Sequence, residues 1–548
     1  MTETTISIFG SWDWLTLGLF LLGLVGIVLW VLRHKEETST DYFLAGRDVG
    51  WIAVGASIFA SNIGSEHLVG LAGTGAESGL AMAHWEMHAW LILVLAWLFV
   101  PFYDRSKVFT MPEFLEKRYC SGARSFLSVI SLVSYVLTKV AVTVYAGGLV
   151  FQTVFGVDKM FGIDFFWIGV VILVVLTGLY TIFGGMRSVL YTSVLQAPVL
   201  IIGSMVILIV GLEKLGGWSE FMTFSGDNIH LIRPASDPEF PWTGVLPASA
   251  IIGFWYWCTD QYIVQRTLSA RNQKHARRGS IFASYMKLTP VFIFMIPGMI
   301  AVALQQKGLL TLSSSDAAFP TLVSTLLPVG FKGIVVGGLM AALMSSLASL
   351  FNSTATLFTV DFYKRYKPES TEKHLVFVGR VATGVVVVLG VLWIPLMGLV
   401  SDVLYVYLQN VQSLIAPSIA AVFVMGVFSK RVTAAGGLTG LISGFILGMF
   451  RLVLMIFQDN LDQGGILYWI LDINWLHYCV YLFLISVGVI IGVSYFTPKP
   501  DENSIRGLTY GSASPEQLAE TRSSWNGWDI FHTSVILSVI VAFYIYFW

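Results

Sequence analysis

The apolar segment from residue 56 to residue 70 contains side chains that a lipid-facing helix does not need. The polar and small residues there are Ser61, Asn62, Gly64, Ser65, Glu66 and His67. Serine, asparagine and glycine compete with helical hydrogen bonding, so we expect the helix to break locally. A break frees backbone carbonyl groups, which can coordinate a small hard cation. A polar contact between continuous helices is the alternative interpretation.

Two further ionisable residues, Glu86 and Lys287, also lie in long apolar segments. An ionisable side chain inside a membrane bundle costs about 2.5–3.5 kcal/mol on insertion scales and indicates a functional site by default. A buried structural pair between Glu86 and Lys287 is the alternative, and both interpretations can hold together. Gln409, in the apolar segment 401–429, adds an amide that suits a hydroxylated ligand.

A third group of candidates lies in the segment 341–356, which is rich in small residues. On a helix, Ala342, Ser345 and Ser346 lie on one face. One carbonyl and two hydroxyls there, together with carbonyls from the broken segment, would give about five neutral oxygens, a set that suits Na⁺. Close packing of small residues is the alternative. The aromatic run 255–261 suits the flat C–H faces of sugars, although such runs more often serve packing or the membrane interface.

The elements that position these residues are membrane-spanning helices. Of the 548 residues, 56% are hydrophobic and 12% are charged, against about 25% charged in a soluble domain. Apolar runs of about twenty residues, which cross a bilayer core of about 30 Å, recur along the chain. The expected spans are 13–33, 49–74, 78–103, 123–153, 162–183, 188–212, 247–266, 279–306, 332–362, 377–398, 401–429, 434–456, 474–497 and 528–547. The sequence therefore predicts an all-α integral membrane protein with fourteen transmembrane helices.

The basic residues predict the orientation of these helices. If the N-terminus is outside, the inward segments hold 24 of the 32 lysines and arginines and the outward segments hold five. Positive charge concentrates on the cytoplasmic side, so both termini are expected outside a plasma (inner) membrane. A net charge of −1 gives no indication of a nucleic-acid partner. The absence of HExxH and GxxxxGK[ST] motifs argues against an enzyme.

Span counting divides the chain into five parts. A peripheral helix and cytoplasmic loop, 1–48, precede a first block of five spans, 49–212. A polar extracellular loop, 213–246, separates it from a second block, 247–429, and peripheral helices follow at 430–548. An odd number of spans in each block makes the two blocks run in opposite directions, as in inverted-repeat transporters, whose sites lie near the midplane.

Several motifs in this order resemble a known family. They are Asp41–Arg47 (DYFLAGR), Ser61–His67 (SNIGSEH), Thr110–Phe114 (TMPEF), Gln265–Ser269 (QRTLS) and Ser345–Thr354 (SSLASLFNST). The chain resembles the sodium:solute symporter family, and within it the sodium/glucose cotransporter branch, from about residue 14 to residue 450. The resemblance implies a leucine-transporter-like core of two inverted five-helix repeats plus four peripheral helices. It also implies sodium-coupled transport of a sugar such as glucose or galactose across the lipid bilayer.

The resemblance implies roles for individual residues. The sodium site corresponds to the carbonyls of Ala60, Ile63 and Ala342 and the hydroxyls of Ser345 and Ser346. The sugar site corresponds to Asn62, His67, Glu86, Lys287 and Gln409, with Tyr256 as an inner gate that stacks on the sugar and Trp257 beside it. The outer gate corresponds to Leu71, Trp85 and Tyr405. In having a histidine at position 67, the chain resembles the animal glucose transporters.

Two departures from the family pattern affect the expected selectivity and stoichiometry. Gly253 stands where relatives that bind sugars tend to carry a polar side chain, so we expect free space there for water or a larger substituent. Ser193 replaces an aspartate that contributes to a second sodium site in some relatives, and Ala348 lacks the hydroxyl that such a site uses. One sodium per sugar is expected. The alternatives are a symporter for myo-inositol or another polyol, and a membrane sugar sensor that does not transport.

Overall fold

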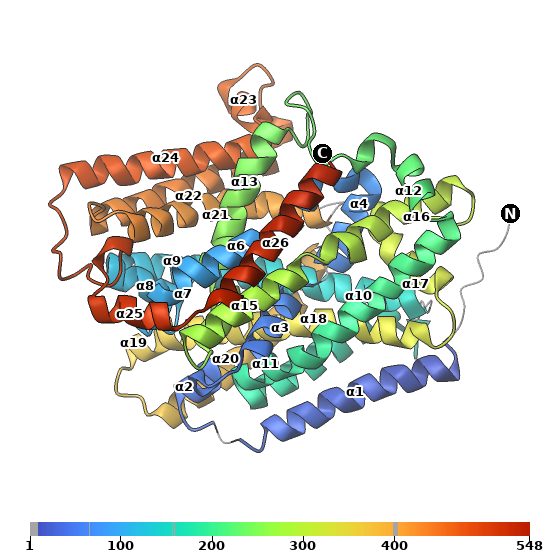
Figure 1. Ribbon diagram of the computed structural model, residues 1–548, viewed down its shortest axis with the longest axis horizontal. Helices are drawn as coiled ribbons and strands as arrows, with labels where there is room; N and C mark the ends of the chain where they lie inside the picture. Colours follow the sequence, from blue (N-terminus) through green and yellow to red (C-terminus); the bar gives the residue numbers. More distant parts are fainter. Residues whose placement is uncertain (1–8, 35, 65, 156, 158, 398–403) are drawn as a thin grey trace.

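The computed structural model describes residues 9–548 except residues 35, 65, 156, 158 and 398–403. The described chain is a mostly helical bundle whose longest helices run in similar directions (Figure 1). Ten helical stretches within the described residues are long and apolar enough to cross a membrane. The prediction of a helical membrane protein is confirmed.

The long helical stretches coincide with the apolar segments of the sequence. They are α1 (Ser11–Val31), Glu66–Ser106, α11 (Phe165–Leu215), Gln273–Gln306, Phe331–Tyr366, α20 (Glu372–Met397), α21 (Leu404–Phe428), α22 (Ala434–Ile456), α24 (Trp475–Phe496) and α26 (Gly527–Tyr546). Shorter apolar helices are α3 (Trp51–Asn62), α10 (Ala141–Phe155) and α13 (Trp242–Phe254). Two of the expected spans, 162–183 and 188–212, overlap the single helix α11, which is interrupted at Gly185 by a non-helical φ of 45°.

Further helices build up the longer stretches and the loops between them. They are α2 (Ser39–Leu44), α4 (Ala72–Ser78), α5 (Ala83–Glu86), α6 (Ala89–Val94), α7 (Val100–Ser106), α8 (Met111–Arg118), α9 (Ser121–Ser134), α12 (Trp218–Ser225), α14 (Gln261–Leu268), α15 (Gln273–Lys287), α16 (Ile296–Gln306), α17 (Ala318–Leu326), α18 (Phe331–Thr356), α19 (Lys364–Tyr366), α23 (Ile466–Asp472) and α25 (Pro515–Ser523). A small antiparallel hairpin joins β1 (Lys159–Met160) to β2 (Ile163–Asp164).

Two helices at the centre of the bundle are discontinuous. Helix α3 ends at Asn62, Ile63 is extended with φ −82° and ψ 106°, and a π-helical segment starts at Glu66. The predicted break is confirmed. A second break separates α13 and its π-helical end, Trp255–Thr259, from α14, and its extended residue is Asp260. Discontinuous helices of this kind form the binding sites of many transporters.

Helix α18 places the serine-rich segment against both breaks. The hydroxyls of Ser61 and Ser349 lie 2.6 Å apart and join the end of α3 to α18. On its other side α18 packs closely on α11, where a Cβ atom on Gly338 would lie 3.1 Å from the Cα atom of Leu200. Small residues allow helices in a membrane to approach in this way. Within segment 341–356, Ser349 faces the break and Ser345 faces α11, where its Oγ lies 3.3 Å from that of Ser193, so the segment takes part in helix packing. The sodium site in this segment stays a prediction.

A buried carboxyl in the loop between α1 and α2 makes stability depend on pH. Burial raises the pKa of Glu36 to about 8, although Arg380 lies 3.5 Å away. Between about pH 5 and pH 8 the folded protein therefore keeps a proton that the unfolded chain releases. We expect the free energy of unfolding to fall as pH rises through this range, by up to about 1.4 kcal/mol per pH unit.

The variant Glu36→Gln should remove this slope, measured as thermal unfolding in detergent at pH 6, 7 and 8. The exposed neighbour provides the control, because Glu37→Gln should leave the slope unchanged.

Candidate functional site

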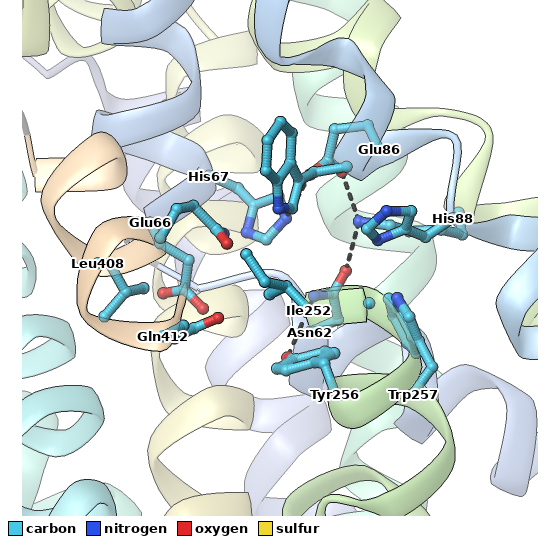
Figure 2. Close-up of a pocket in the computed structure, with 14 residues that line it drawn as sticks. Asn62, Glu66, His67, Glu86, His88, Ile252, Tyr256, Trp257, Leu408 and Gln412 are labelled. Carbon is cyan, nitrogen blue, oxygen red and sulfur yellow. Dashed lines mark hydrogen bonds and ion pairs between the residues drawn. The ribbon is translucent and has the colours of Figure 1, made fainter. Parts of the chain in front are cut away.

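A polar cavity lies where the two discontinuous helices meet α15 and α21. The residues that line it are Asn62, Glu66, His67, Trp85, Glu86, His88, Ile252, Gly253, Tyr256, Trp257, Lys287, Leu408, Gln409 and Gln412. All seven residues predicted to bind the substrate are among them. Figure 2 shows Glu86 and His88 on one side of this cavity and Glu66 and Gln412 on the other.

An ion pair between α5 and α15 anchors one wall of the cavity. Nζ of Lys287 lies 2.6 Å from Oε2 of Glu86, and both side chains are buried. Lys287 also donates to Oδ1 of Asn62 at 3.0 Å. Nε2 of His67 lies 3.4 Å from Oε1 of Glu86. The paired charges compensate each other, and the cluster presents fixed donors and acceptors that match the hydroxyl groups of a neutral ligand.

Aromatic side chains form the wall next to this ion pair. Nδ2 of Asn62 donates to the hydroxyl of Tyr256 at 3.2 Å, which joins the two broken helices across the cavity (Figure 2). Trp257 is fully buried, and its ring centre lies 5.4 Å from Nζ of Lys287. A ring face beside charged and amide groups is suited to a sugar, which has an apolar C–H face and polar edges. Oε1 of the buried Gln409 has no hydrogen-bond partner among the described residues, so it can accept from a ligand.

Of the five residues predicted to bind sodium, Ser346 lies beside the end of α3. The hydroxyl of Tyr262 is hydrogen-bonded both to the carbonyl of Ser61 and, at 3.0 Å, to Oγ of Ser346. This links α18 to the end of α3, which carries Ala60 and Ile63. Oγ of Ser345 instead lies 3.3 Å from Oγ of Ser193 on α11. Ala342 lies one turn earlier in α18 and is buried. These oxygens could hold a small hard cation between the two helices.

The three predicted outer-gate residues have different positions. Trp85 lines the cavity, and its ring stacks on that of Trp475 with centroids 6.0 Å apart. Leu71 is fully buried at the end of the π-helical segment and does not line the cavity. The side chain of Tyr405 lies outside the described residues.

The expectation of free space beside Gly253 is wrong. A Cβ atom on Gly253 would lie 2.5 Å from Cε1 of His88 and 2.5 Å from Cδ1 of Leu91. His88 therefore fills the space that a side chain at position 253 would need. Nε2 of His88 has no hydrogen-bond partner among the described residues, and the ring lines the cavity. The polar group that Gly253 lacks is thus supplied from another helix segment.

Sequence reasoning also missed a second buried ion pair near the cavity. Nζ of Lys139 lies 2.7 Å from Oδ2 of Asp260 and 4.8 Å from the ring centre of Tyr256, and the hydroxyl of Tyr135 donates to the same Asp260. Asp260 caps α14 by accepting from the backbone N–H of Tyr262. An aspartate inside an apolar run is a helix N-cap signal, and it could have indicated the second break.

Comparisons with known proteins show the family of this chain. Residues 42–444 match the family model described as the sodium:solute symporter family. The chain belongs to the sodium:solute symporter family. It is 36% identical to the human sodium/myo-inositol cotransporter 2, over 91% of this chain and 78% of that protein. It is also 36% identical to the rabbit sodium/glucose cotransporter 1, over 89% of this chain and 79% of that protein.

Solved structures show the same fold. A Na⁺-coupled sialic acid symporter in a substrate-bound outward-open state has a TM-score of 0.75 at 22% identity, covering 90% of this chain and 99% of that one. The nucleobase-cation-symport-1 family transporter Mhp1, in a closed conformation, has a TM-score of 0.52 at 13% identity, covering 87% of this chain and 99% of that one. This symporter is therefore a multi-pass membrane transporter and not an enzyme, and Na⁺ is its coupling ion.

His88 provides a test of the cavity as the substrate site of this symporter. The variant His88→Ala removes a ring nitrogen that faces the cavity. We expect the substrate concentration for half-maximal uptake to rise about tenfold. A change of this size corresponds to the free energy of one lost hydrogen bond. His88→Gln, which keeps a polar group, should lose less. The control is His84→Ala, because the buried His84 bonds instead to Tyr544 and the carbonyl of Leu231 and does not line the cavity. Equal uptake kinetics in the parent and His88→Ala would exclude a contact between His88 and the substrate.

Proposed function

We propose that this symporter couples the entry of one sodium ion to the uptake of a neutral monosaccharide resembling glucose or galactose. The observation that carries the proposal is the composition of the cavity. A compensated ion pair, Glu86–Lys287, lies beside the amides of Asn62 and Gln409 and the ring of Tyr256. Such a site offers many hydrogen bonds and an aromatic face, and its ion pair adds no net charge, which favours a polyhydroxylated neutral solute.

The proposed mechanism is alternating access. Sodium binds first at Ala60, Ile63, Ala342, Ser345 and Ser346, and it holds the broken segment against α18. The cavity is about 40 Å³, so a monosaccharide needs side chains such as Tyr256 or Trp85 to move. These motions are the proposed inner and outer gates. One sodium ion crossing 100 mV gains about 2.3 kcal/mol, enough for roughly 50-fold accumulation before any chemical gradient.

The local structure at Ser193 supports a single sodium ion at the neutral site. Oγ of Ser193 bonds to the carbonyl of Val189 at 2.7 Å, so no carboxylate is available at this position. Ala348, about one turn after Ser345 on α18, is fully buried and offers no hydroxyl. A ratio of two sodium ions per substrate, measured from reversal potentials, would contradict this stoichiometry.

We further propose the architecture expected from the sequence. Fourteen spans would form inverted repeats at 49–212 and 247–429, with an extracellular loop at 213–246 and peripheral helices within 1–48 and 430–548. The breaks in α3 and between α13 and α14 fall near the start of each proposed repeat, which supports this division. The distribution of basic residues supports both termini outside a plasma membrane.

A myo-inositol or polyol symporter is the second candidate. It is favoured because the chain is as similar to sodium/myo-inositol cotransporter 2 as to sodium/glucose cotransporter 1, at 36% identity to each. Inositol is also a neutral ring with hydroxyls on every edge, so the same donors and acceptors can hold it.

Uptake into proteoliposomes tests the function. Labelled glucose, galactose and myo-inositol are supplied with an inward sodium gradient or with potassium in its place. Sodium-dependent accumulation of glucose or galactose that is lost in Gln409→Ala would support the proposal. Accumulation of myo-inositol alone would select the second candidate. Binding of sugar without accumulation of any of the three would instead favour a sensor.

A further inference from the structure

Glu66 occupies a position that the predicted sites do not include. It is the first residue of the π-helical segment that follows the break. Its side chain lines the substrate cavity, and Figure 2 shows it opposite Glu86. It also lines a second, smaller cavity together with Lys139, Tyr262, Ser346 and Gln412. One carboxylate therefore faces both the substrate cavity and a space next to a predicted sodium ligand.

Distances measured from Gly64 give an upper limit for the separation of this carboxylate and the hydroxyl of Ser346. A Cβ atom on Gly64 would lie 2.5 Å from Oε2 of Glu66 and 3.0 Å from Oγ of Ser346. These two oxygens are therefore no more than 5.5 Å apart, the sum of the two distances. A side chain at position 64 would displace the carboxylate from this place beside Ser346. The second cavity is about 10 Å³, roughly the room of one water molecule or small ion.

The two lysines nearest to Glu66 form ion pairs with other carboxylates. Nζ of Lys139, which lines the second cavity, lies 2.7 Å from the carboxylate of Asp260. Nζ of Lys287 lies 2.6 Å from Glu86. Each lysine therefore forms its ion pair with another carboxylate, while His67 and Lys139 still attract the charge of Glu66 through space. A carboxylate at membrane depth is costly unless a cation compensates its charge.

We propose that the carboxylate of Glu66 is a charged member of the cation site, next to the neutral oxygens around Ser346. The inference rests on the proposed sodium site. A sodium ion there is compensated by Glu66, and its binding changes the charge that the substrate meets in the neighbouring cavity. Because the same side chain lines both cavities, Glu66 links occupation of the ion site to the affinity for substrate.

Sodium binding can be tested without any transported solute. The purified symporter is heated in detergent with increasing NaCl at constant ionic strength, with KCl as the balancing salt, and the sodium concentration for half of the stabilisation is recorded. We expect Glu66→Gln to raise this concentration at least about tenfold, because a unit charge about 5 Å from a cation is removed from an enclosed site. Glu66→Asp, which keeps the charge, should stay within about threefold of the parent. The control is Glu77→Gln, which removes the same charge at an exposed position on α4 and should change nothing.

The outcomes separate this inference from the proposed function. An unchanged half-effect concentration in Glu66→Gln, or an equal loss in Glu66→Asp, would overturn the role of the charge, whether or not sugar is transported. If the parent does not take up sugar but its sodium response still depends on Glu66, only the substrate proposal is overturned.

If Glu66→Gln does not fold, Glu66→Ala replaces it as the uncharged variant in the same comparison with Glu66→Asp. If neither uncharged variant folds while Glu66→Asp binds sodium like the parent, Gly64→Ala decides the question. Its Cβ atom would press on both Glu66 and Ser346, so normal sodium binding there would overturn the proposal.

Discussion

Replacing Lys287 with methionine should abolish uptake and lower the free energy of unfolding by about 3–5 kcal/mol, because it leaves a buried carboxylate unpaired. Nζ of Lys287 lies 2.6 Å from Oε2 of Glu86, and both side chains are almost wholly buried. Lys287 also donates to Asn62, so the variant removes a donor from the wall of the cavity. Thermal or denaturant unfolding in detergent and uptake in proteoliposomes measure the two effects.

A double variant distinguishes a structural pair from a substrate-binding pair. In Glu86→Gln/Lys287→Met neither charge is left uncompensated, so most of the lost stability should return. Uptake should stay at background, because the charged donors and acceptors for substrate hydroxyls are still absent. Recovery of both stability and uptake would show that the pair is only structural. No recovery of stability would contradict the assignment of an isolated pair, and would point to a wider network through His67, which lies 3.4 Å from Glu86.

Replacing both Ser345 and Ser346 with alanine should remove the sodium dependence of uptake. The hydroxyl of Ser346 is bonded to Tyr262 at 3.0 Å, and that tyrosine also bonds to the carbonyl of Ser61 beside the break. The variant removes two of the predicted oxygen ligands and the link between α18 and the broken segment. Substrate uptake should fall to the level measured in potassium, because the affinity of a neutral site for sodium depends on the number of its oxygen ligands.

The same helix supplies the control for this experiment. Ser349 lies one turn after Ser346 on α18, and its hydroxyl lies 2.6 Å from that of Ser61. Ser349→Ala therefore removes a hydrogen bond at the same helix contact without removing a predicted sodium ligand. It should keep its sodium dependence at a somewhat lower stability, by about 1 kcal/mol. Uptake that is still driven by sodium in Ser345→Ala/Ser346→Ala would show that the ion binds elsewhere.

The single variants separate the two serines. Ser346 lies at the break, whereas Ser345 faces Ser193 on α11. Since adjacent helical residues point about 100° apart, the two hydroxyls of α18 face different neighbouring helices. Ser346→Ala should therefore also affect the cavity that contains Glu66, and Ser345→Ala should not.

Local sequence determined the broken segment and the apolar elements around it. Ser61, Asn62 and Gly64 predict a break by their own conformational preferences, and the structure ends α3 at Asn62. Apolar length predicts spans, because the cost of crossing a bilayer is a sum over neighbouring residues. The motifs that indicated the family are also short, continuous stretches, and the match to the family model confirms the family. Ionisable residues in those spans were identified as site candidates for the same local reason.

Only the tertiary structure decided which of these groups meet. Glu86 and Lys287 are about two hundred residues apart in the chain, and the sequence could only raise their pairing as an alternative. The filling of the space beside Gly253 by His88, the pairing of Lys139 with Asp260, and the closeness of Glu66 to Ser346 were not predicted at all. Each depends on the relative rotation and depth of helices from different parts of the chain. Hydropathy and local propensity contain no information on that register, since it is set by close packing between small residues such as Gly338 and the backbone of α11.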